Sequence, residues 1–205
     1  MSTVPDNILD AVAAGAYHAP HDVLGVHEQG EGWVIRARRP MAATVTAIAA
    51  DGAEIPLHHV RGGIWEGAAA SRPDAYELVA TYTDGPDYRA DDPYRHLPSL
   101  GEMDQHLIRE GRHEELWRVL GSHVRHYAGV EGVSFAVWAP DARAVRVAGD
   151  LNGWDGSAHA MRSLGSSGVW ELFVPGLGAG TSYKYEILTP YDGWIMKADP
   201  MAQWA

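Results

Sequence analysis

The sequence contains no cysteine and no long run of apolar residues. Without cysteine, neither a disulfide nor a thiolate metal site can hold the fold, which is typical of proteins from a reducing compartment. No stretch is long enough to span a bilayer. The opening residues carry Asp6 and Asp10 but no basic residue before Arg36, so no secretory signal is predicted. These absences favour a cytoplasmic protein.

Positive charge is also scarce. The 16 lysine and arginine residues face 27 aspartate and glutamate residues, giving a formal net charge of −11 at pH 7. This charge repels phosphate backbones and anionic lipids, so neither nucleic acid nor a membrane is an expected partner. The histidine pairs His18/His21 and His58/His59 have no third ligand at a fixed spacing, so neither a metal nor another cofactor is expected.

The chain contains an internal repeat of about a hundred residues, a length that suits a duplicated domain. The segment from Gly15 to His27 recurs from Gly111 to His123, with Leu24-Gly25 matching Leu120-Gly121 at a shift of 96 (121 − 25). The match continues with a growing shift through 33–40 and 133–140, 63–66 and 168–171, and 92–93 and 199–200.

Each copy contains short segments in which apolar and polar residues alternate between turn-forming residues, which indicates antiparallel strands. We therefore predict an all-β protein of two tandem immunoglobulin-like β-sandwiches. The domains are 1–96 with a short leading helix, a helical linker 97–121, and 122–205. The expected strands are 33–38, 43–48, 55–58, 64–67 and 75–82 in the first copy, and 133–138, 144–148, 169–174 and 182–189 in the second.

Two regions are predicted to be helical. Ile8, Leu9, Val12 and Ala13 recur at helical spacing, with Asp6 or Asn7 as the expected cap. The linker is expected to form one or two short helices broken at Gly111.

The stretch 151–155, Leu-Asn-Gly-Trp-Asp, places a tryptophan on a turn. The Asn-Gly pair tolerates a positive φ and so favours a tight turn. Two interpretations of Trp154 are open. It could pack back onto the sandwich as a satellite of the core, or it could offer its flat indole to the apolar face of a sugar ring while Asn152 bonds hydroxyls.

Three segments resemble the bacterial 1,4-α-glucan (glycogen) branching enzymes: 92–123, DPYRHLPSLGEMDQHLIREGRHEELWRVLGSH; 132–155, GVSFAVWAPDARAVRVAGDLNGWD; and 197–202, KADPMA. HAPHDVLGVH, near the start, resembles the opening of their N-terminal module. The resemblance implies an N-terminal module and a glycogen-binding-type module (family 48 of carbohydrate-binding modules), followed in the family by a catalytic (β/α)8 barrel and a C-terminal β-domain.

The resemblance further implies that the parent protein is a transferase of the glycoside hydrolase family 13 type. Such an enzyme cuts α-1,4 links and rebuilds them as α-1,6 branches in glycogen biosynthesis. The expected partners are α-1,4-glucans, such as glycogen and maltooligosaccharides, and the protein's own catalytic barrel.

No catalytic residue is expected in this chain. A barrel needs roughly 250 residues, and a retaining glycosyl transfer needs two carboxyl groups about 5 Å apart across the scissile bond. The available acidic pairs, Asp91 with Asp92 and Glu114 with Glu115, are neighbours in sequence and are predicted to be solvated.

The candidate glucan-binding residues are Trp154, Asn152, Lys184 and Trp194. Their order resembles that in the glycogen-binding module of AMP-activated kinase β-subunits, where a Trp after an Asn-rich turn, a Lys on a strand and a second Trp after a Gly converge on a glucan. The loop 191–193 departs from that pattern. The first copy reads Ala-Ala-Asp-Gly at 49–52, so no sugar platform is expected there.

The remaining strand tryptophans, Trp65, Trp138 and Trp170, are predicted to pack in cores or between domains. Two other functions stay open. Both modules could be structural docking domains without a sugar site, or the second could come from a related debranching enzyme.

Overall fold

The computed structural model describes residues 2–202 and divides into two compact units. The first unit runs to Ala14 and resumes over Pro20–Arg95; the second comprises Gly15–Ala19 and the chain from His96 onward. Residues 97–121, predicted as a linker, thus group with the second unit. No helix among the described residues is long and apolar enough to cross a membrane.

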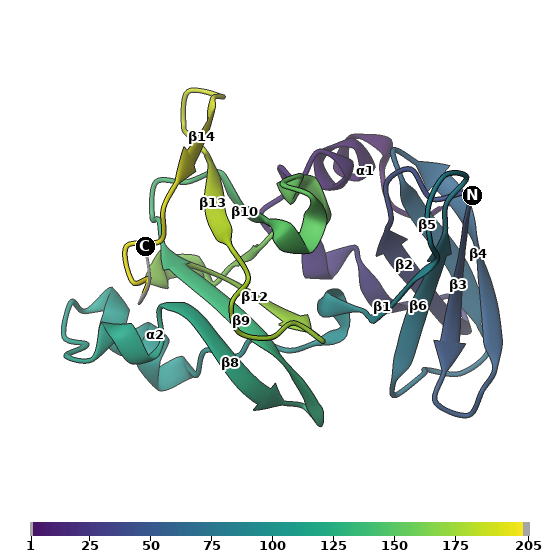
Figure 1. Cartoon of the computed structure of the whole chain (residues 1–205), viewed down its shortest axis with the longest axis horizontal. Coiled ribbons are helices and arrows are strands. Elements are labelled where there is room, and N and C mark those ends of the chain that lie inside the picture. The colour runs from purple at the N-terminus through teal and green to yellow at the C-terminus, as the bar shows by residue number, and fades with distance from the viewer. Residues whose placement is uncertain (1, 203–205) are drawn as a thin grey trace. The chain divides into compact units, whose positions relative to one another are not determined.

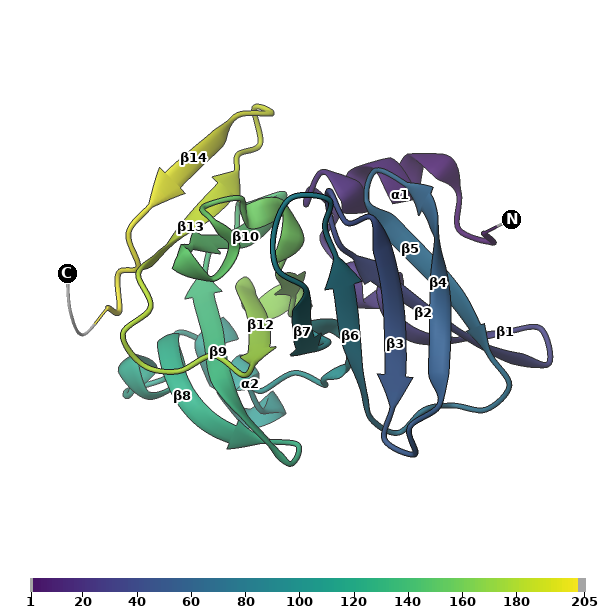
Figure 2. The same cartoon turned by 45° about the vertical axis from the view of Figure 1, so that its right-hand side comes forward.

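The first unit is a seven-stranded antiparallel sheet in the order β1-β2-β5-β4-β3-β6-β7, part of which Figure 2 shows side by side as β4, β3 and β6. Its strands are β1 (Gly25–Gln29), β2 (Gly32–Arg38), β3 (Thr44–Ala49), β4 (Glu54–Arg61), β5 (Ile64–Ala69), β6 (Tyr76–Thr81) and β7 (Tyr88–Asp91). Its helices are α1 (Asp6–Ala13), η1 (Pro20–Asp22) and η2 (Pro93–Arg95).

The sheet of the first unit curls around one core. Ile35 on β2, Val45 on β3 and Leu78 on β6 are all buried in the same cluster, although β2 and β6 are separated by three strands. A flat sheet could not bring these side chains together. The ladder between β4 and β5 is irregular between His59 and Arg61, a feature that bends a strand and increases its twist.

The second unit is a sandwich of two antiparallel sheets, β10-β13-β14 and β11-β12-β9-β8. The strands are β8 (Gly121–Tyr127), β9 (Val130–Trp138), β10 (Ala144–Gly149), β11 (Arg162–Ser163), β12 (Val169–Pro175), β13 (Tyr183–Leu188) and β14 (Trp194–Lys197). The helices are α2 (Glu102–Arg109), η3 (Leu116–Arg118), η4 (Asp150–Asn152), η5 (Gly156–Ala158) and η6 (Gly165–Ser167).

Aromatic residues join the two sheets of the second unit. Phe135 on β9 and Tyr183 on β13 meet edge to face, with ring centroids 4.9 Å apart. Tyr185 is fully buried, and its hydroxyl lies 3.4 Å from the carbonyl of Ala136 on the facing sheet. The predicted all-β architecture with immunoglobulin-like sandwiches is confirmed.

All nine predicted strands are present, but β1, β7, β8, β11 and β14 were not predicted. The expected cap of α1 is wrong. The helix begins at Asp6, and the cap residue is Pro5, which has no side-chain acceptor; the amides of Ile8 and Leu9 donate to its backbone carbonyl instead.

Trp65 and Trp170 are buried as predicted, at 7% and 4% exposed. Trp138 does not lie in a core, since this side chain is 56% exposed at the end of β9, and its packing between domains stays a prediction. Alternation along a strand indicates which face a side chain occupies, but not whether the end of that face is covered.

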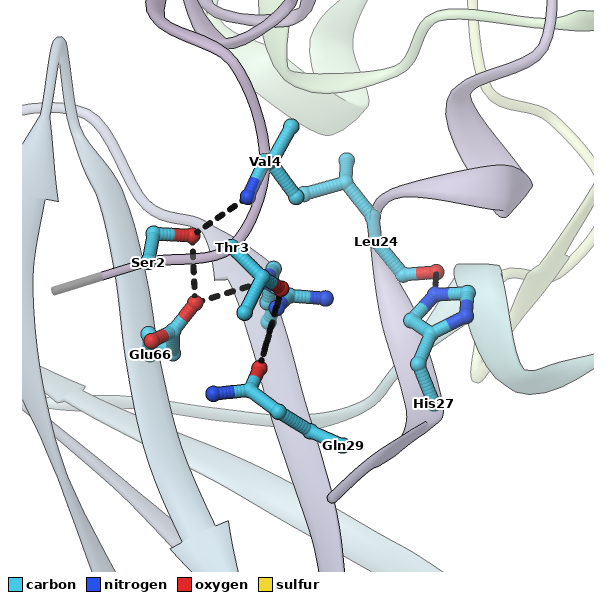
Figure 3. Close-up of polar contacts among 8 residues, drawn as sticks. Ser2, Thr3, Val4, Leu24, His27, Gln29 and Glu66 are labelled. Carbon is cyan, nitrogen blue, oxygen red and sulfur yellow. Dashed lines mark hydrogen bonds and ion pairs between the residues drawn. The ribbon is translucent and has the colours of Figure 1, made fainter.

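The internal repeat is visible in matched side-chain contacts. His27 Nε2 donates to the Leu24 carbonyl at 3.0 Å (Figure 3), and His123 Nε2 donates to Leu120 at 2.9 Å. The two buried indoles also match. Trp65 Nε1 donates to the carbonyl of Arg39 at 3.1 Å, and Trp170 Nε1 to that of Ala139 at 3.0 Å.

A buried glutamate holds the leading segment of each unit. In the first, the Ser2 hydroxyl donates to Glu66 at 2.8 Å, beside Thr3 and Gln29 (Figure 3). In the second, the Ser99 hydroxyl donates to the equivalent Glu171 at 2.6 Å. Since α1 and α2 follow these serines, the repeat includes the leading helix, and α2 is its second copy.

Candidate functional site

The turn that carries Trp154 follows directly from β10. The chain passes through η4, and then Gly153 and Trp154 both adopt left-handed backbone angles, with φ of 60° and 68°. The sequence predicted a positive φ for the Asn-Gly pair but not for the tryptophan. An L-residue in this region costs roughly 1–2 kcal/mol, so surrounding contacts must hold Trp154 in place.

Asn152 supplies several of those contacts. Its Oδ1 accepts from the Gly149 amide at 3.0 Å, and its Nδ2 donates to the Val147 carbonyl at 2.8 Å and lies 3.0 Å from His159 Nδ1. Both amide hydrogens are therefore engaged within the turn. In this geometry Asn152 fixes the turn and has little capacity left to bond a sugar hydroxyl.

The Trp154 side chain is 42% exposed and does not belong to the core. Its Nε1 donates to Asp150 Oδ1 at 3.2 Å, while Asp150 Oδ2 accepts from the Ser182 amide at 3.1 Å. One carboxylate thus orients the indole and ties its turn to the residue just before β13. The packing of Trp154 as a satellite of the core is not what the structure shows.

Lys184 lies on the outer face of the three-stranded sheet. It is exposed and pairs with Ala148 on β10, while its neighbour Tyr185 points into the core. Because residues alternate between faces along a strand, Glu186 and Leu188 share the outer face with Lys184.

Trp194 reaches the same face from the edge strand β14, where it pairs with Leu188 (Figure 1). The guanidinium carbon of Arg146 lies 3.8 Å from the centroid of its ring, and Arg146 Nε bonds Glu186 at 2.6 Å. The arginine covers one face of the indole, so only the other can take a sugar. Asp192, in the loop before Trp194, has a positive φ of 62° and pairs with Arg143.

The structure gathers all four candidates at one sheet. The turn of Trp154 and Asn152 adjoins the start of β13, Lys184 follows within that strand, and Trp194 pairs with its end. From Lys184 to Leu188 the strand advances about 13 Å at 3.3 Å per residue. Between them, the side chains of Arg146 and Glu186 are only 15% and 16% exposed, and Leu188 is buried, so the exposed parts of this face lie at Trp154 and Lys184 and at Trp194.

Sequence reasoning missed three residues that shape this surface: Arg146, Asp150 and Glu186. Asp150 lies at the end of a strand where a turn begins, a position that favours an aspartate. The sequence therefore contained a signal for its role in the turn. Arg146 and Glu186 became recognisable as a pair only once the register of β10 and β13 was known.

Glu114 and Glu115 are both exposed, as predicted, and Glu115 pairs with Arg118 at 3.1 Å. Asp91 and Asp92 do not form two facing carboxyl groups either. Asp91 is bound to Arg95, and Asp92 is fully buried, accepting from the Tyr76 hydroxyl at 2.6 Å and the Tyr94 amide at 3.1 Å. The prediction that Asp92 is solvated is wrong. Burial raises the pKa of Asp92 above its ordinary value, although the nearby Arg39 opposes this shift.

The equivalent aspartate in the second unit, Asp199, accepts a hydrogen bond from the Tyr183 hydroxyl. Burial, together with this bond, raises the pKa of Tyr183 above its ordinary value. Both aspartates are therefore structural. Among residues 2–202, no three His, Cys, Asp or Glu side chains are grouped so that they could hold a metal ion.

Two family models match the chain. The model described as "alpha-1,4-glucan branching enzyme GlgB, N-terminal domain" matches residues 5–94. The model described as "Carbohydrate-binding module 48 (Isoamylase N-terminal domain)" matches residues 119–202. Residues 95–118, which include α2, lie outside both matches, and the second match includes all four candidate residues.

Curated relatives extend well beyond this chain. The 1,4-alpha-glucan branching enzyme GlgB of Leifsonia xyli subsp. xyli is 53% identical over 98% of this chain and 28% of its own length. The enzyme of the same name from Thermobifida fusca is 54% identical over 95% of this chain and 27% of its own. The chain therefore spans a little over a quarter of the length of these relatives.

Among solved structures, a pullulanase from Paenibacillus barengoltzii in complex with maltohexaose and alpha-cyclodextrin aligns with 42% of this chain and 15% of its own length, at 23% identity. The TM-score of this alignment is 0.32.

Proposed function

We propose that this chain, which belongs to the 1,4-alpha-glucan branching enzyme GlgB family as its N-terminal region, binds α-1,4-glucan on the outer face of β10, β13 and β14. The observation that carries the proposal is the state of Trp154. Its indole is held by Asp150 in a left-handed turn, yet it remains 42% exposed. A large aromatic kept in a costly conformation at the surface is better explained by a ligand than by packing.

The candidates take different roles in this proposal. Trp154 and the uncovered face of Trp194 stack on sugar rings, and Lys184 donates to hydroxyls. Asn152 acts indirectly by holding the Trp154 turn, because its amide is already bonded within that turn.

Binding at such a site is weak for a single chain end. One or two stacked rings and a few hydrogen bonds, each worth about 0.5–1.5 kcal/mol net, give an affinity on the order of millimolar to high micromolar. Repeated engagement along a polymer raises the effective affinity, so glycogen and maltooligosaccharides are the expected ligands.

Affinity electrophoresis in gels containing glycogen tests the proposal. Wild-type chain should be retarded relative to a gel without glycogen, and Trp154→Ala should lose that retardation. Trp138→Ala is the matched control, because Trp138 is an exposed tryptophan of the same unit that lies outside the proposed surface. Unchanged retardation of Trp154→Ala would refute the sugar platform.

Lysine labelling tests the role of Lys184 separately. The chain has only two lysines, Lys184 and Lys197, and both are exposed. Acetylation with and without maltoheptaose, followed by mass spectrometry, should show protection of Lys184 with Lys197 as the internal reference. Equal labelling of Lys184 in both samples would remove it from the site.

We further propose that a longer protein containing this chain makes α-1,6 branches in glycogen biosynthesis, and that the chemistry takes place outside residues 2–202. The support is the name of the relatives and the buried or ion-paired state of Asp91 and Asp92. The chain alone should leave the iodine spectrum of amylose unchanged. A blue-shifted spectrum, which reports branching, would contradict this assignment.

A further inference from the structure

The arginine that covers Trp194 is itself enclosed. Only 15% of the Arg146 side chain is exposed, and its Nε donates to Glu186 at 2.6 Å. A Cβ on Gly156, which begins η5, would meet the Glu186 carboxylate and would lie 2.8 Å from Arg146 Cγ. The lack of a side chain at Gly156 therefore lets the backbone of η5 pack directly against the ion pair.

A second contact with Arg146 comes from a segment far earlier in the sequence. Residues Gly15–Ala19 follow α1 but group with the second unit. Gly15 is buried and has a left-handed φ of 62°. A Cβ on it would lie 3.1 Å from Ser157 Cα and 3.2 Å from Arg146 Cδ. The backbone of Gly15 thus packs against both η5 and the aliphatic part of the arginine.

This segment is fixed to the second unit by a main-chain bond. The Ser163 amide, on β11, donates to the His18 carbonyl at 2.8 Å. Because β11 is the edge strand of its sheet, the segment satisfies a backbone donor that an edge leaves open. Gly15 is therefore held near Arg146 by a bond that lies outside the proposed glucan surface.

The internal repeat shows that the scaffold does not need this contact. Gly111, the match of Gly15, also follows a helix and has a left-handed φ of 65°, as helix ends commonly require. Within 4 Å of a Cβ on Gly111, however, the described residues place no atom. The glycine that packs against an arginine is thus a feature of the first copy alone.

We propose that Gly15 and Arg146 are positioning residues of the glucan site. The segment Gly15–Ala19 and η5 hold Arg146 in place, and Arg146 holds the indole of Trp194 so that its other face is ready for a sugar ring. The inference rests on the proposed function and adds residues that do not touch the sugar. Its consequence is that Gly15 sets the affinity of a surface formed by β10, β13 and β14.

The physical basis is preorganisation. A guanidinium attracts the face of an indole, and the bond from Nε to Glu186 fixes the plane of that guanidinium. An aromatic ring that is already held in its binding orientation loses less conformational entropy when a sugar stacks on it. Because Arg146 is so little exposed, it acts through Trp194.

Gly15→Ala and its matched control Gly111→Ala test the proposal in the full described chain. Both variants carry the same left-handed strain, but only the methyl group at residue 15 meets Arg146. Gly15→Ala should weaken maltoheptaose binding about twofold to threefold, because the displaced arginine frees the indole. Gly111→Ala should bind as the wild type does.

Fluorine NMR of the chain labelled with 5-fluorotryptophan supplies a readout that needs no glucan. The resonances of Trp194 and Trp154 are assigned with Trp194→Phe and Trp154→Phe. Gly15→Ala should shift the resonance of Trp194 and leave that of Trp154 in place. A loss of stability alone would move neither resonance selectively while the chain is folded.

Removal of the guanidinium should have a larger effect. Arg146→Met is combined with Glu186→Gln, so that no carboxylate is left without its arginine. This double variant should weaken maltoheptaose binding about threefold to tenfold, while Glu186→Gln alone should have the smaller effect.

The outcomes separate this inference from the function on which it rests. If the wild-type chain does not bind maltoheptaose, the proposed function fails and the inference fails with it. If the wild type binds but Gly15→Ala binds equally tightly, or leaves the Trp194 resonance unmoved, only the positioning role is overturned. Equal weakening by Gly111→Ala would overturn it too, because the effect would then come from backbone strain.

Discussion

The two units have the same scaffold but differ at the turn after their third matched strand. In the first unit β3 ends at Ala49, and a short turn through Asp51 and Gly52 leads into β4. In the second, β10 ends at Gly149 and the longer turn that follows presents Trp154. The difference shows that the proposed binding surface depends on a loop, while the scaffold that carries this loop also forms without it.

Contacts that recur in both units are those that the scaffold needs. The buried indole bonded to a carbonyl, the histidine bonded back to its Leu-Gly turn and the aspartate bonded to a tyrosine all appear twice. Trp154, Lys184 and Trp194 have no such counterpart. Within a duplicated chain, the residues that do not repeat are therefore the better candidates for function.

The largest loss of stability is expected when the matched glutamates, Glu66 and Glu171, are replaced. Glu171→Ala leaves Arg162 and the Ser99 amide and hydroxyl without their carboxylate in a fully buried place. Breaking a buried pair in this way costs about 3–5 kcal/mol. Glu66→Ala should cost less, about 2–3 kcal/mol, because Arg36 keeps Gln29 as a partner at 2.7 Å.

Amide hydrogen exchange of β12 and β5 measures the two losses separately, since each strand carries one of the glutamates. Glu171→Gln is the control. This variant keeps an acceptor for Ser99, so its free energy of unfolding should fall by less than that of Glu171→Ala. A larger loss of stability for Glu66→Ala than for Glu171→Ala would show that Gln29 does not stabilise Arg36 once Glu66 is removed.

Much of the fold could be predicted because its signals are local. Alternation and turn residues revealed nine strands, and the Leu-Gly-x-His motif at 24–27 and 120–123 revealed the duplication. The strands β1 and β8 begin within that same motif but were missed. Their exposed edge residues do not alternate clearly, and their pairing depends on distant partners.

The site was predictable only in part. The Asn-Gly-Trp turn carries its own signal in sequence, so Trp154 and Asn152 could be found. The stacking of Arg146 on Trp194 depends on strand register and on a side chain that reaches across β13. The burial of Asp92 depends on Tyr76, 16 residues earlier. Long-range contacts of this kind leave no pattern in a single sequence.

Alanine substitutions of the matched glycines, Gly25 and Gly121, are expected to have smaller effects on stability that differ between the two positions. Gly25 and Gly121 both have left-handed backbones, with φ of 93° and 97°. A Cβ on Gly25 would lie 2.6 Å from the Tyr94 carbonyl oxygen, whereas one on Gly121 would lie 3.1 Å from Met201 Cβ. Gly121→Ala should cost about 1–2 kcal/mol for the backbone alone, and Gly25→Ala about 2–4 kcal/mol because the clash adds to it.

Urea unfolding with hydrogen exchange in each unit compares these two variants. Gly30→Ala is a matched control, because its φ of 64° is also left-handed but nothing lies within 4 Å of its Cβ. It should behave like Gly121→Ala. Equal losses for Gly25→Ala and Gly121→Ala would mean that the Tyr94 carbonyl can move aside.

The smallest expected effect is also the strictest test of the duplication. His27→Ala and His123→Ala each remove one hydrogen bond to a carbonyl, at 3.0 and 2.9 Å, and each should cost about 0.5–1.5 kcal/mol. Because both rings are half-buried and bond the same position of the same motif, the two losses should agree within about 0.5 kcal/mol. Hydrogen exchange of β1 and β8 measures them, with the exposed His58→Ala as the control expected to change little. If the loss for one histidine were more than twice that for the other, the shared motif would contribute differently to stability in the two copies, and matched positions could no longer be assumed to have matched roles.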